Sequence, residues 1–491
     1  MIADLQEEKN IRETLIRIKQ QIREDEDYKT QFLQWEQEHH RLPECLGHED
    51  PKVRKNAALL IGELGLQEDI EALWEAYQTE QTLFVKSSYL TAMERLDFHL
   101  YTEKLHELYE KLCSMQPAEN EKKHYKEQLK VLGQMLRSME PHKRHKFSGY
   151  DKELDVLLLT NPSYREVTAS QIRDGKVLLT KAGVRVKTTN LRELLAIRTY
   201  QEMIFFLPGI KRVQPDPEKM AEMVVQAGIV EYLKKLHASQ KTPFYFRVEM
   251  RGRQDDHVRR SLIHKFAEAL EEQSDRELIN AVDDYEVEIR LAPASDGTYL
   301  PCLKFFTIPM RRFAYRKQSV AATTQPATAA LLMQLAKKYL TEDAQVLDPF
   351  CGVGTMLIER DLLVAAGDMY GTDIFGEAVK KGRENALAAG MNINFINRNF
   401  FDFTHKYLFD EIVTDMPLRG KKTREEQDGF YADFFRKVTE VLRPEGYMFL
   451  YSNENGFVKK QLRLHKEFRL VKEDCIREKT GYYFFVIRYK E

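Results

Sequence analysis

The sequence predicts an α/β fold class in several parts: an all-α N-terminal region, a central α+β region and a C-terminal region built on a parallel sheet. Apolar residues follow helical spacing up to about residue 140, and short β-rich runs mix with helical segments from about 150 to 310. From Thr341 onward, strands, glycine turns and helices alternate. Such alternation is typical of a parallel α/β sheet.

Length and composition agree with a globular protein of several domains. The chain has 491 residues, of which 43% are hydrophobic and 31% charged. It lacks an apolar run of the roughly 18 residues that a membrane helix needs, and its charged N-terminus is unlike a secretory signal. The five cysteines show no CxxC pairing, which favours a reducing compartment and argues against a zinc site. We therefore expect a cytoplasmic protein with no membrane partner and no metal.

Two segments of the N-terminal region repeat. Residues 53–64 align with residues 85–96 at an offset of 32, and both carry apolar residues at helical spacing. Asp50-Pro51 before the first copy is a helix-start signal. The stretch DPKVRKNAALLIGELG resembles HEAT repeats, whereas a plain helical bundle is the other interpretation. Either would provide residues 1–145 with a surface for RNA or for a protein partner.

A glycine turn follows the first strand of the C-terminal region. Gly352 and Gly354 let backbone approach a ligand closely, and a helix begins near Thr355. A dinucleotide site would need a third glycine where this chain has Leu357, so the pattern favours S-adenosylmethionine (SAM) over NAD. The candidate cofactor-binding residues of this turn are Asp348, Phe350, Cys351, Gly352, Gly354 and Thr355.

Acidic residues end the next two predicted strands. Asp373 lies 25 residues after Asp348, where a carboxylate accepts hydrogen bonds from ribose hydroxyls, and Ile374 follows it. Asp402 and Phe403 stand where an adenine amino group would be bound. The last segments, Phe468 to Ile476 and Tyr482 to Tyr489, predict a terminal antiparallel hairpin. A methyltransferase has such a hairpin, whereas a typical dehydrogenase domain lacks it.

The fourth predicted strand ends at Asp415-Met416-Pro417-Leu418. The lone pair of an exocyclic amine on a base is delocalised into the ring, which makes the amine a poor nucleophile. A carboxylate and a backbone carbonyl that accept hydrogen bonds from the amine would turn the lone pair toward a methyl donor. The candidate catalytic residues are Asp415, Pro417 and Leu418.

These motifs resemble the THUMP-associated RNA guanine-N2 methyltransferases. Arg312-Phe-Ala-Tyr-Arg316, followed by Gln325-Pro326-Ala327, is similar to the stretch that helps to close the cofactor site in that family. FRVEMRGR and DYEVEIRL resemble THUMP strands. The resemblance implies a ferredoxin-like segment (146–235), a THUMP-like RNA-binding domain (236–310), a linker (311–340) with Pro326 near the cofactor, and a Rossmann-like class I methyltransferase domain (341–491).

The chain departs from this family at Leu418. Family members usually carry Tyr or Phe there, and an aromatic ring would stack on a flipped base. Leucine offers apolar contact without the same stacking. This departure bears on the identity of the target and on catalytic rate.

Positive charge gathers in the central region although the whole chain has a formal net charge of −2. Residues 297–341 contain no acid, and residues 241–265 carry seven bases against three acids. A cationic face of this kind binds phosphate without reading sequence. The candidate RNA-binding residues are Arg247, Arg251, Arg253, Arg312 and Arg316.

Together these features predict a SAM-dependent enzyme that methylates N2 of a guanine in structured RNA, with tRNA favoured over ribosomal RNA. An N6-adenine or protein-glutamine methyltransferase is an alternative, because related Pro-containing motifs serve there too. A third interpretation is a catalytically attenuated SAM- and RNA-binding assembly factor. The expected partners are structured RNA and, on the N-terminal helices, a protein.

Overall fold

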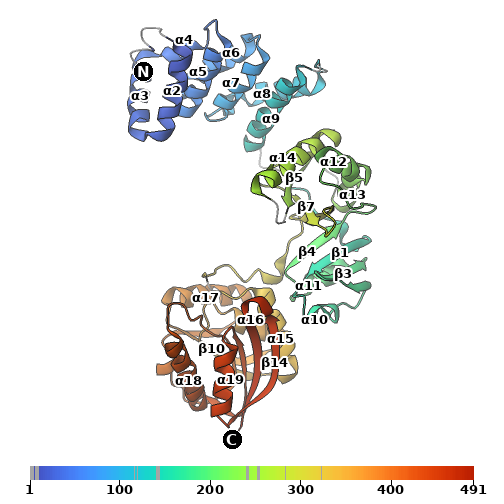
Figure 1. Cartoon of the computed structure of the whole chain (residues 1–491), viewed down its shortest axis with the longest axis vertical. Helices are drawn as coiled ribbons and strands as arrows, with labels where there is room; N and C mark the ends of the chain where they lie inside the picture. The colour runs from blue at the N-terminus through green and yellow to red at the C-terminus, as the bar shows by residue number, and fades with distance from the viewer. Residues whose placement is uncertain are drawn as a thin grey trace. The chain divides into compact units, whose positions relative to one another are not determined.

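The computed structural model describes residues 5, 10–115, 117–118, 120–139, 144–238, 243–250, 255–281, 283–321 and 323–490, and its ribbon is drawn in Figure 1. The chain divides into two compact units, Met1–Lys143 and Arg144–Glu491. We call them unit 1 and unit 2 and describe each by itself. In the described ranges, no helix has both the length and the apolar character needed to cross a membrane.

Unit 1 is helical throughout its described regular structure. Asp50 caps α5 by accepting a hydrogen bond from the Lys52 amide (2.8 Å), with Pro51 as the first helical residue, as the sequence predicts. The repeated segments form α5 and α7, which pack directly on each other. Gly62 permits this approach, since an added Cβ would lie 2.6 Å from Cα of Ala92. The HEAT-like identity of these helices stays a prediction. The helices are α2 (Ile11–Glu24), α3 (Glu26–His39), α4 (Arg41–Cys45), α5 (Pro51–Leu64), α6 (Ile70–Thr79), α7 (Leu83–Met93), α8 (Thr102–Ser114) and α9 (Lys122–Met139).

Unit 2 begins with an eight-stranded sheet in the order β2-β3-β1-β4-β8-β7-β5-β6. Its pairs are antiparallel except that β5 runs parallel to β6 and β7. Strands from residues 146–235 and from 236–310 thus share one sheet, and their division into two domains stays a prediction. The strands are β1 (Leu154–Leu159), β2 (Lys176–Leu179), β3 (Gly183–Thr188), β4 (Glu202–Phe206), β5 (Phe244–Met250), β6 (Leu278–Asn280), β7 (Val287–Pro293) and β8 (Tyr299–Phe305). The helices of this part are α10 (Arg165–Ala169), α11 (Leu191–Ala196), α12 (Pro217–Gln226), α13 (Ile229–Leu236) and α14 (Asp256–Gln273).

Strand β7 corrects one expectation. Its alternation of apolar and charged residues predicts a half-buried strand, yet residues 287–291 are all buried. Glu288 and Arg290, on the polar face, form an ion pair with each other, and further ion pairs join them to β5 and β4. Because ion pairs to neighbouring strands cover the polar face, the charged side chains of β7 are buried although they alternate with apolar ones.

The second sheet of unit 2 has the order β11-β10-β9-β12-β13-β15-β14. The first five strands are parallel, and the hairpin β14–β15 adds to β13 in antiparallel orientation, as predicted. The strands are β9 (Ala344–Asp348), β10 (Ala366–Asp373), β11 (Ile393–Asn397), β12 (Phe409–Asp415), β13 (Leu442–Ser452), β14 (Phe468–Arg477) and β15 (Tyr482–Tyr489).

Helices cover both faces of this sheet (Figure 1). One apolar core contains residues of α15 (Pro326–Ala336), α16 (Thr355–Leu363) and α17 (Gly376–Ala389). The other contains residues of α18 (Arg424–Val441) and α19 (Asn455–Leu464). Val346 belongs to the first core and Leu347 to the second, because successive side chains of a strand face opposite sides. These three layers form the predicted Rossmann-like fold.

Helix α18 starts earlier than its apolar pattern suggests. The pattern predicts a helix from Phe430, whereas α18 begins at Arg424. Thr423 and Glu426 form a capping box: the Thr423 hydroxyl accepts from the Glu426 amide (3.1 Å), and the Glu426 carboxylate accepts from the Thr423 amide (2.7 Å). This T-x-x-E signal lies in a charged stretch ahead of the apolar residues.

Candidate active site

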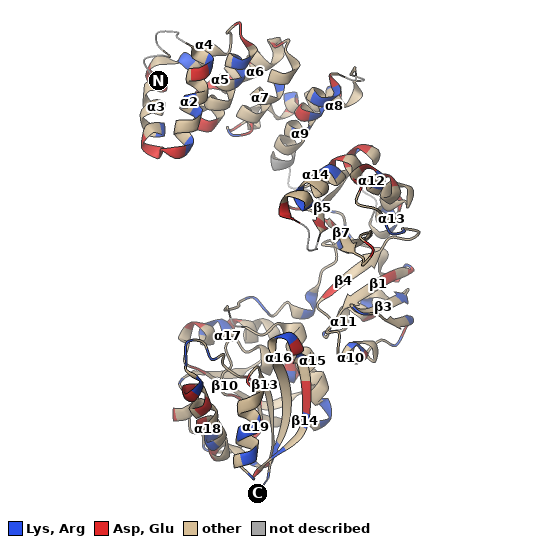
Figure 2. Ribbon diagram, in the orientation of Figure 1, with Lys and Arg blue, Asp and Glu red and all other residues tan. Residues whose placement is uncertain are grey.

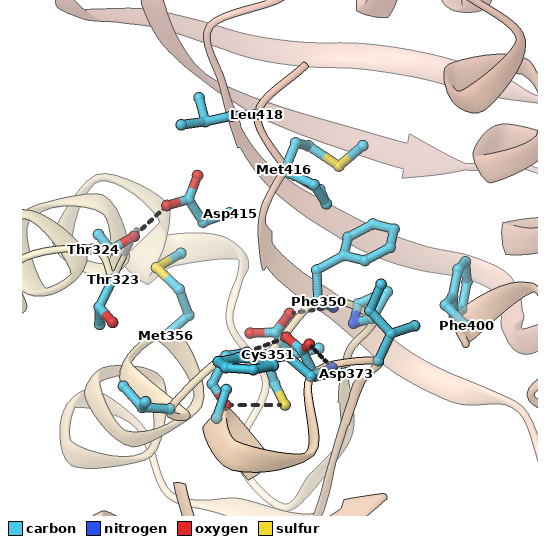
Figure 3. Close-up of a pocket in the computed structure, with 18 of the residues that line it drawn as sticks. Thr323, Thr324, Phe350, Cys351, Met356, Asp373, Phe400, Asp415, Met416 and Leu418 are labelled. Atoms are coloured by element: carbon cyan, nitrogen blue, oxygen red, sulfur yellow. Dashed lines mark hydrogen bonds between the residues drawn. The ribbon is translucent and has the colours of Figure 1, made fainter. Parts of the chain in front are cut away.

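A cavity of about 620 Å³ opens at the carboxyl ends of β9, β10 and β12. This volume falls in the range of roughly 300–1,000 Å³ that small-molecule sites occupy. The structure brings Asp348, Asp373 and Asp415 together in its lining. Figure 3 shows Asp415 and Leu418 at one end and Asp373 with Cys351 at the other, with Met356 and Phe350 between them.

The glycine turn after β9 forms one wall. Gly352 and Gly354 have φ of 51° and 79°, a backbone conformation that side chains disfavour, and a Cβ on Gly354 would lie 2.7 Å from the Phe395 ring. Thr355, the first residue of α16, lines the cavity, and its buried hydroxyl oxygen has no hydrogen-bond partner among the described residues. An unpaired hydroxyl at a helix N-terminus fits an anionic ligand group such as a carboxylate.

Asp373 ends β10 in a geometry set by two backbone amides. Its carboxylate accepts hydrogen bonds from Gly352 N (2.9 Å) and Phe375 N (2.8 Å), which fix its orientation. The apolar side chains that follow line the cavity although they are open to solvent; Ile374 is 75% exposed. A carboxylate beside exposed apolar surface suits the ribose and base of a nucleoside.

Four residues predicted to bind the cofactor lie outside the cavity lining: Gly354, which precedes Thr355 in the glycine turn, Asp402, Phe403 and Pro326. β11 ends at Asn397, and Asn399 caps a short turn by accepting from Phe401 N (3.2 Å). Asn399, Phe400 and Phe401 therefore line the cavity, whereas Asp402 points to solvent and Phe403 is buried in the core. Pro326 is likewise buried at the start of α15 outside the lining, and Thr323 and Thr324 line the cavity in its place.

Asp348 is fully buried at the end of β9. Its carboxyl group accepts hydrogen bonds from the Thr414 hydroxyl (2.6 Å) and the Phe350 amide (3.1 Å). Burial nevertheless raises its pKa to about 8, and the nearby Asp373 and Asp415 add to the rise. Asp348 therefore carries a proton at neutral pH in the ligand-free protein.

Asp415 stands at the end of β12 and receives a hydrogen bond from the Thr324 hydroxyl (Figure 3). Burial raises its pKa to about 6, although the Thr324 hydroxyl and the Arg477 charge oppose the rise. At neutral pH this carboxylate is mostly ionised and remains close to its protonation range. Met416, Pro417 and Leu418 continue the lining, and Leu418 is 51% exposed.

Sequence reasoning missed several lining residues that come from distant segments. Thr324 belongs to the linker, Phe430 to α18 and Tyr482 to β15. The Tyr482 ring stacks on Tyr451, with ring centroids 4.9 Å apart. No local motif marks these residues, because only the folded sheet brings them to the cavity.

The linker is fastened to the second sheet's helices by buried polar contacts. Glu359 of α16 accepts hydrogen bonds from the Tyr315 hydroxyl (2.6 Å) and from Arg198 (2.7 and 2.8 Å). Gln318 exchanges two hydrogen bonds with Asn385 of α17, at 2.9 and 3.0 Å. These contacts hold the linker against the domain. The linker residues Val320, Thr323 and Thr324 follow directly and line the cavity.

The predicted RNA-binding arginines have different surroundings. Arg251 and Arg253 lie outside the described residues. Arg247 pairs with Glu288 (2.7 Å). Arg312 donates to the carbonyls of residues 197 and 201 and stacks on the Tyr200 ring at 3.4 Å, and burial lowers its pKa to about 10. Arg312 thus has an internal role, whereas Arg316 lies beside the cavity and donates to Thr324 O (3.3 Å).

Comparisons with known proteins agree with this fold. Residues 313–480 match the family model UPF0020, described as an RMKL-like methyltransferase domain. The crystal structure of TrmN from Thermus thermophilus is similar with a TM-score of 0.51 and 21% identity, covering 69% of this chain and 100% of that one. SMU.472 complexed with SAH gives a TM-score of 0.51 and 14% identity, covering 69% and 99%. That 69% is about the share of the chain that unit 2 occupies.

One curated relative matches over a shorter stretch. Uncharacterized protein MG259 of Mycoplasma genitalium is 31% identical over 117 residues, which is 23% of this chain. The matched stretch spans a quarter of that relative's length. Together, the family model, the fold and the geometry of the cavity make residues 313–480 a SAM-dependent methyltransferase domain.

Proposed function

We propose that this enzyme transfers a methyl group from SAM to N2 of a guanine in structured RNA, with tRNA favoured over ribosomal RNA. The observation that carries the proposal is the ionisable Asp415 at the opposite end of the cavity from Asp373, followed by Met416-Pro417. This places an acceptor for amine protons where a nucleobase would enter.

We assign the cofactor to the part of the cavity between the glycine turn and β11. Asp373 would accept hydrogen bonds from the ribose hydroxyls, and Gly352, Gly354 and Thr355 would hold the methionine carboxylate. Ile374 and the aromatic rings after β11 would contact the adenine, with Asn399 available for its polar edge. When bound, SAM supplies an electrophilic methyl group on a positively charged sulfur.

Asp415 would make the guanine amine reactive. Its carboxylate accepts a hydrogen bond from N2–H and turns the nitrogen lone pair toward the methyl group. As the new N–C bond forms and the methyl–sulfur bond breaks, N2 loses a proton. A carboxylate with a pKa near 6 can receive that proton and return it to water. Thr324 holds the carboxylate in place through its hydrogen bond.

Tyr482 offers the aromatic contact that Leu418 lacks. Its ring lines the cavity together with Asp415, and Tyr451 supports it from behind. A base extruded from RNA would stack on this ring beside Leu418. This arrangement favours a working enzyme over an attenuated assembly factor. For the RNA backbone we propose Arg316, with Arg251 and Arg253 as further candidates.

Nucleoside mass spectrometry tests the proposal. Cells that lack the gene should lose one N2-methylguanosine site in tRNA, and the intact gene should restore it. A gene carrying Asp415→Ala should fail to restore it, because we expect a roughly 100- to 1,000-fold slower transfer. Asp402→Ala is the matched control, since that carboxylate faces solvent.

Four other outcomes would contradict the proposal. Loss of N6-methyladenosine would make the enzyme an adenine methyltransferase, and loss of a methylated glutamine would make a protein its substrate. SAM binding without turnover on any tRNA or ribosomal RNA pool would favour the assembly factor. Full activity of Asp415→Ala would remove the mechanism.

A further inference from the structure

The helices of unit 1 form two rows that differ in charge. In the first row α2 contacts α5, α5 contacts α7, and α7 contacts α9, whereas α3, α6 and α8 pack on α2, α7 and α9 respectively. Figure 2 marks the charged positions along these helices. Within the first row, α2, α5 and α7 carry eight bases (Arg12, Arg17, Lys19, Arg23, Lys52, Arg54, Lys55, Lys86) and three acids (Glu13, Glu24, Glu63). In the second row, α3, α6 and α8 carry three bases (Lys29, Lys104, Lys111) and nine acids (Glu26, Asp27, Glu36, Glu38, Glu71, Glu75, Glu103, Glu107, Glu110).

The first row contains a basic cluster, which we define as Lys19, Arg23, Lys55 and Arg95. Lys19, Arg23 and Arg95 gather around Glu63 of α5, and Lys55 lies close enough to Lys19 to repel its charge. Arg23 pairs with Glu63 at 2.6 Å and Arg95 pairs with it at 3.7 Å. Lys19 lies one helical turn before Arg23 on α2, so both project from one face. The cluster thus joins α2, α5 and the end of α7.

One carboxylate cannot neutralise four cations held this close together. Burial lowers the pKa of Lys19, and the positive charges of Arg23, Arg95 and Lys55 lower it further. The carboxylate of Glu63 opposes this shift. Arg23 and Arg95 also remain open to solvent, with 56% and 46% of their side chains exposed. The fold therefore keeps mutually repelling charges at a surface, a cost that a bound anion would relieve.

Helix packing does not require these charges. The helices α2 and α5 already bury aliphatic side chains in one apolar core, including Leu15, Ile18, Ile22, Ala57 and Ile61. Surface ion pairs contribute only about 0–1 kcal/mol each, so the single Glu63 pairing is a weak reason to gather four bases. A role in binding accounts for the cluster better than a role in folding.

We propose that the basic cluster, with the rest of the first row, binds the phosphate backbone of the same RNA that the methyltransferase domain modifies. Nucleic acid fits this surface because its charges are evenly spaced and close, at about 1.7 Å of axis per charge in a duplex. The cores of protein interfaces are instead depleted of lysine and rich in aromatic residues. The choice of RNA over DNA rests on the proposed function.

The test is a triple substitution in the full chain, Lys19→Ala, Lys55→Ala and Arg95→Ala. It leaves the Arg23–Glu63 pair and the apolar core in place, and an unchanged melting temperature verifies that unit 1 stays folded. We expect the affinity for a fluorescently labelled unmodified tRNA transcript to fall roughly 10- to 100-fold at low salt. The slope of log affinity against log salt should become shallower by about 2 to 3, because three phosphate contacts are lost.

The second row supplies the matched control. Lys29→Ala, Lys104→Ala and Lys111→Ala remove the same charge from α3 and α8, and should leave both the affinity and the salt slope unchanged. In single-turnover methylation, the first-row variant should need more RNA for half-saturation yet reach the original rate at saturation. A structural defect would lower that rate.

The outcomes separate this inference from the proposed function. If the first-row variant keeps its tRNA affinity and salt slope, the inference is overturned whatever reaction the enzyme performs. If it loses affinity for polyglutamate but not for tRNA, the row docks an acidic protein and the inference is equally wrong. If both tRNA affinity and slope fall while no N2-methylguanosine is found, the inference stands and the proposed reaction fails.

Discussion

Two acids of the first sheet and the acids at the strand ends of the second sheet in unit 2 have opposite surroundings. In the first sheet the buried Glu288 pairs with Arg247 and Arg290, and the partly buried Glu202 pairs with Arg290 and Lys304. Burial alone would raise the pKa of Glu202, but hydrogen bonds from those cations outweigh it and lower the pKa to about 2. Glu202 is thus held in the ionised state, and the ion pairs of both acids join neighbouring strands.

In the second sheet the acids at the strand ends lack such partners. Among the described residues, no lysine or arginine forms an ion pair with Asp348 or Asp415, and burial raises their pKa values to about 8 and about 6. A cationic ligand such as the sulfonium of SAM would favour the ionised form of these carboxyl groups. The difference teaches that acids paired with cations stabilise the fold in this molecule, whereas buried acids without a cationic partner at the cavity are available to a ligand.

Removing a paired charge should have the largest effect on stability. Glu288 is 1% exposed and accepts hydrogen bonds from Arg247 (2.7 and 3.1 Å) and Arg290 (2.6 and 3.0 Å). Glu288→Gln would leave Arg247 without this counter-charge and Arg290 with Glu202 alone, and we expect a loss of about 3–5 kcal/mol. Thermal unfolding followed by circular dichroism measures it as a clear fall in melting temperature.

The matched control is an exposed pair beside the same sheet. Arg144 and Asp284 pair with about half of each side chain exposed, so Asp284→Asn should change stability by less than about 1 kcal/mol. Equal melting temperatures for the two variants would mean that buried pairing contributes nothing to this sheet.

Removing an acid from the cavity should affect ligand binding more than stability. Asp373→Ala would delete the acceptor that we assign to the ribose hydroxyls, and the loss of even one hydrogen bond to a charged group accounts for a roughly 10- to 100-fold weaker SAM affinity. Isothermal titration calorimetry measures this. Glu377→Ala, at an exposed acid on α17, is the control. Unchanged affinity of Asp373→Ala would place the cofactor elsewhere.

The sequence predicts the parts of the site that depend on local structure. A strand followed by a glycine turn fixes where Asp348, Gly352 and Gly354 lie, and the same reasoning places Asp373 and Asp415 at strand ends. The error at β11 is also local. The strand ends at Asn397 and the chain turns at Asn399, so the cavity receives the residues just before Asp402. A polar residue after a strand does not reveal how soon the chain turns.

The sequence did not predict the contacts between segments that are far apart in the chain. Thr324 meets Asp415 across 91 positions of the chain, and Tyr482 enters the cavity from the terminal hairpin. The contacts of Arg247 with Glu288 and of Arg312 with Tyr200 also join distant segments. A sequence does not show which guanidinium groups find such partners inside the fold. A count of charges therefore includes arginines that already have partners in the fold.

Measured per pH unit, the smallest expected effect is a pH dependence that isolates one unpaired acid. The pKa of Asp348 is about 8 in the folded protein, against about 3.9 in an unfolded chain, so the folded state keeps a proton that the unfolded state releases. Its contribution to the free energy of unfolding should therefore decline as pH rises from about 5 to 8, by up to about 1.4 kcal/mol per pH unit. Asp348→Asn, which cannot ionise, should remove this slope. Urea unfolding of the SAM-free protein at several pH values measures it, with the exposed Asp368→Asn as the variant that keeps the original slope. If Asp348→Asn follows the same pH dependence as the original protein, Asp348 is ionised in the fold, and the contrast between paired and unpaired acids would rest on Asp415 alone.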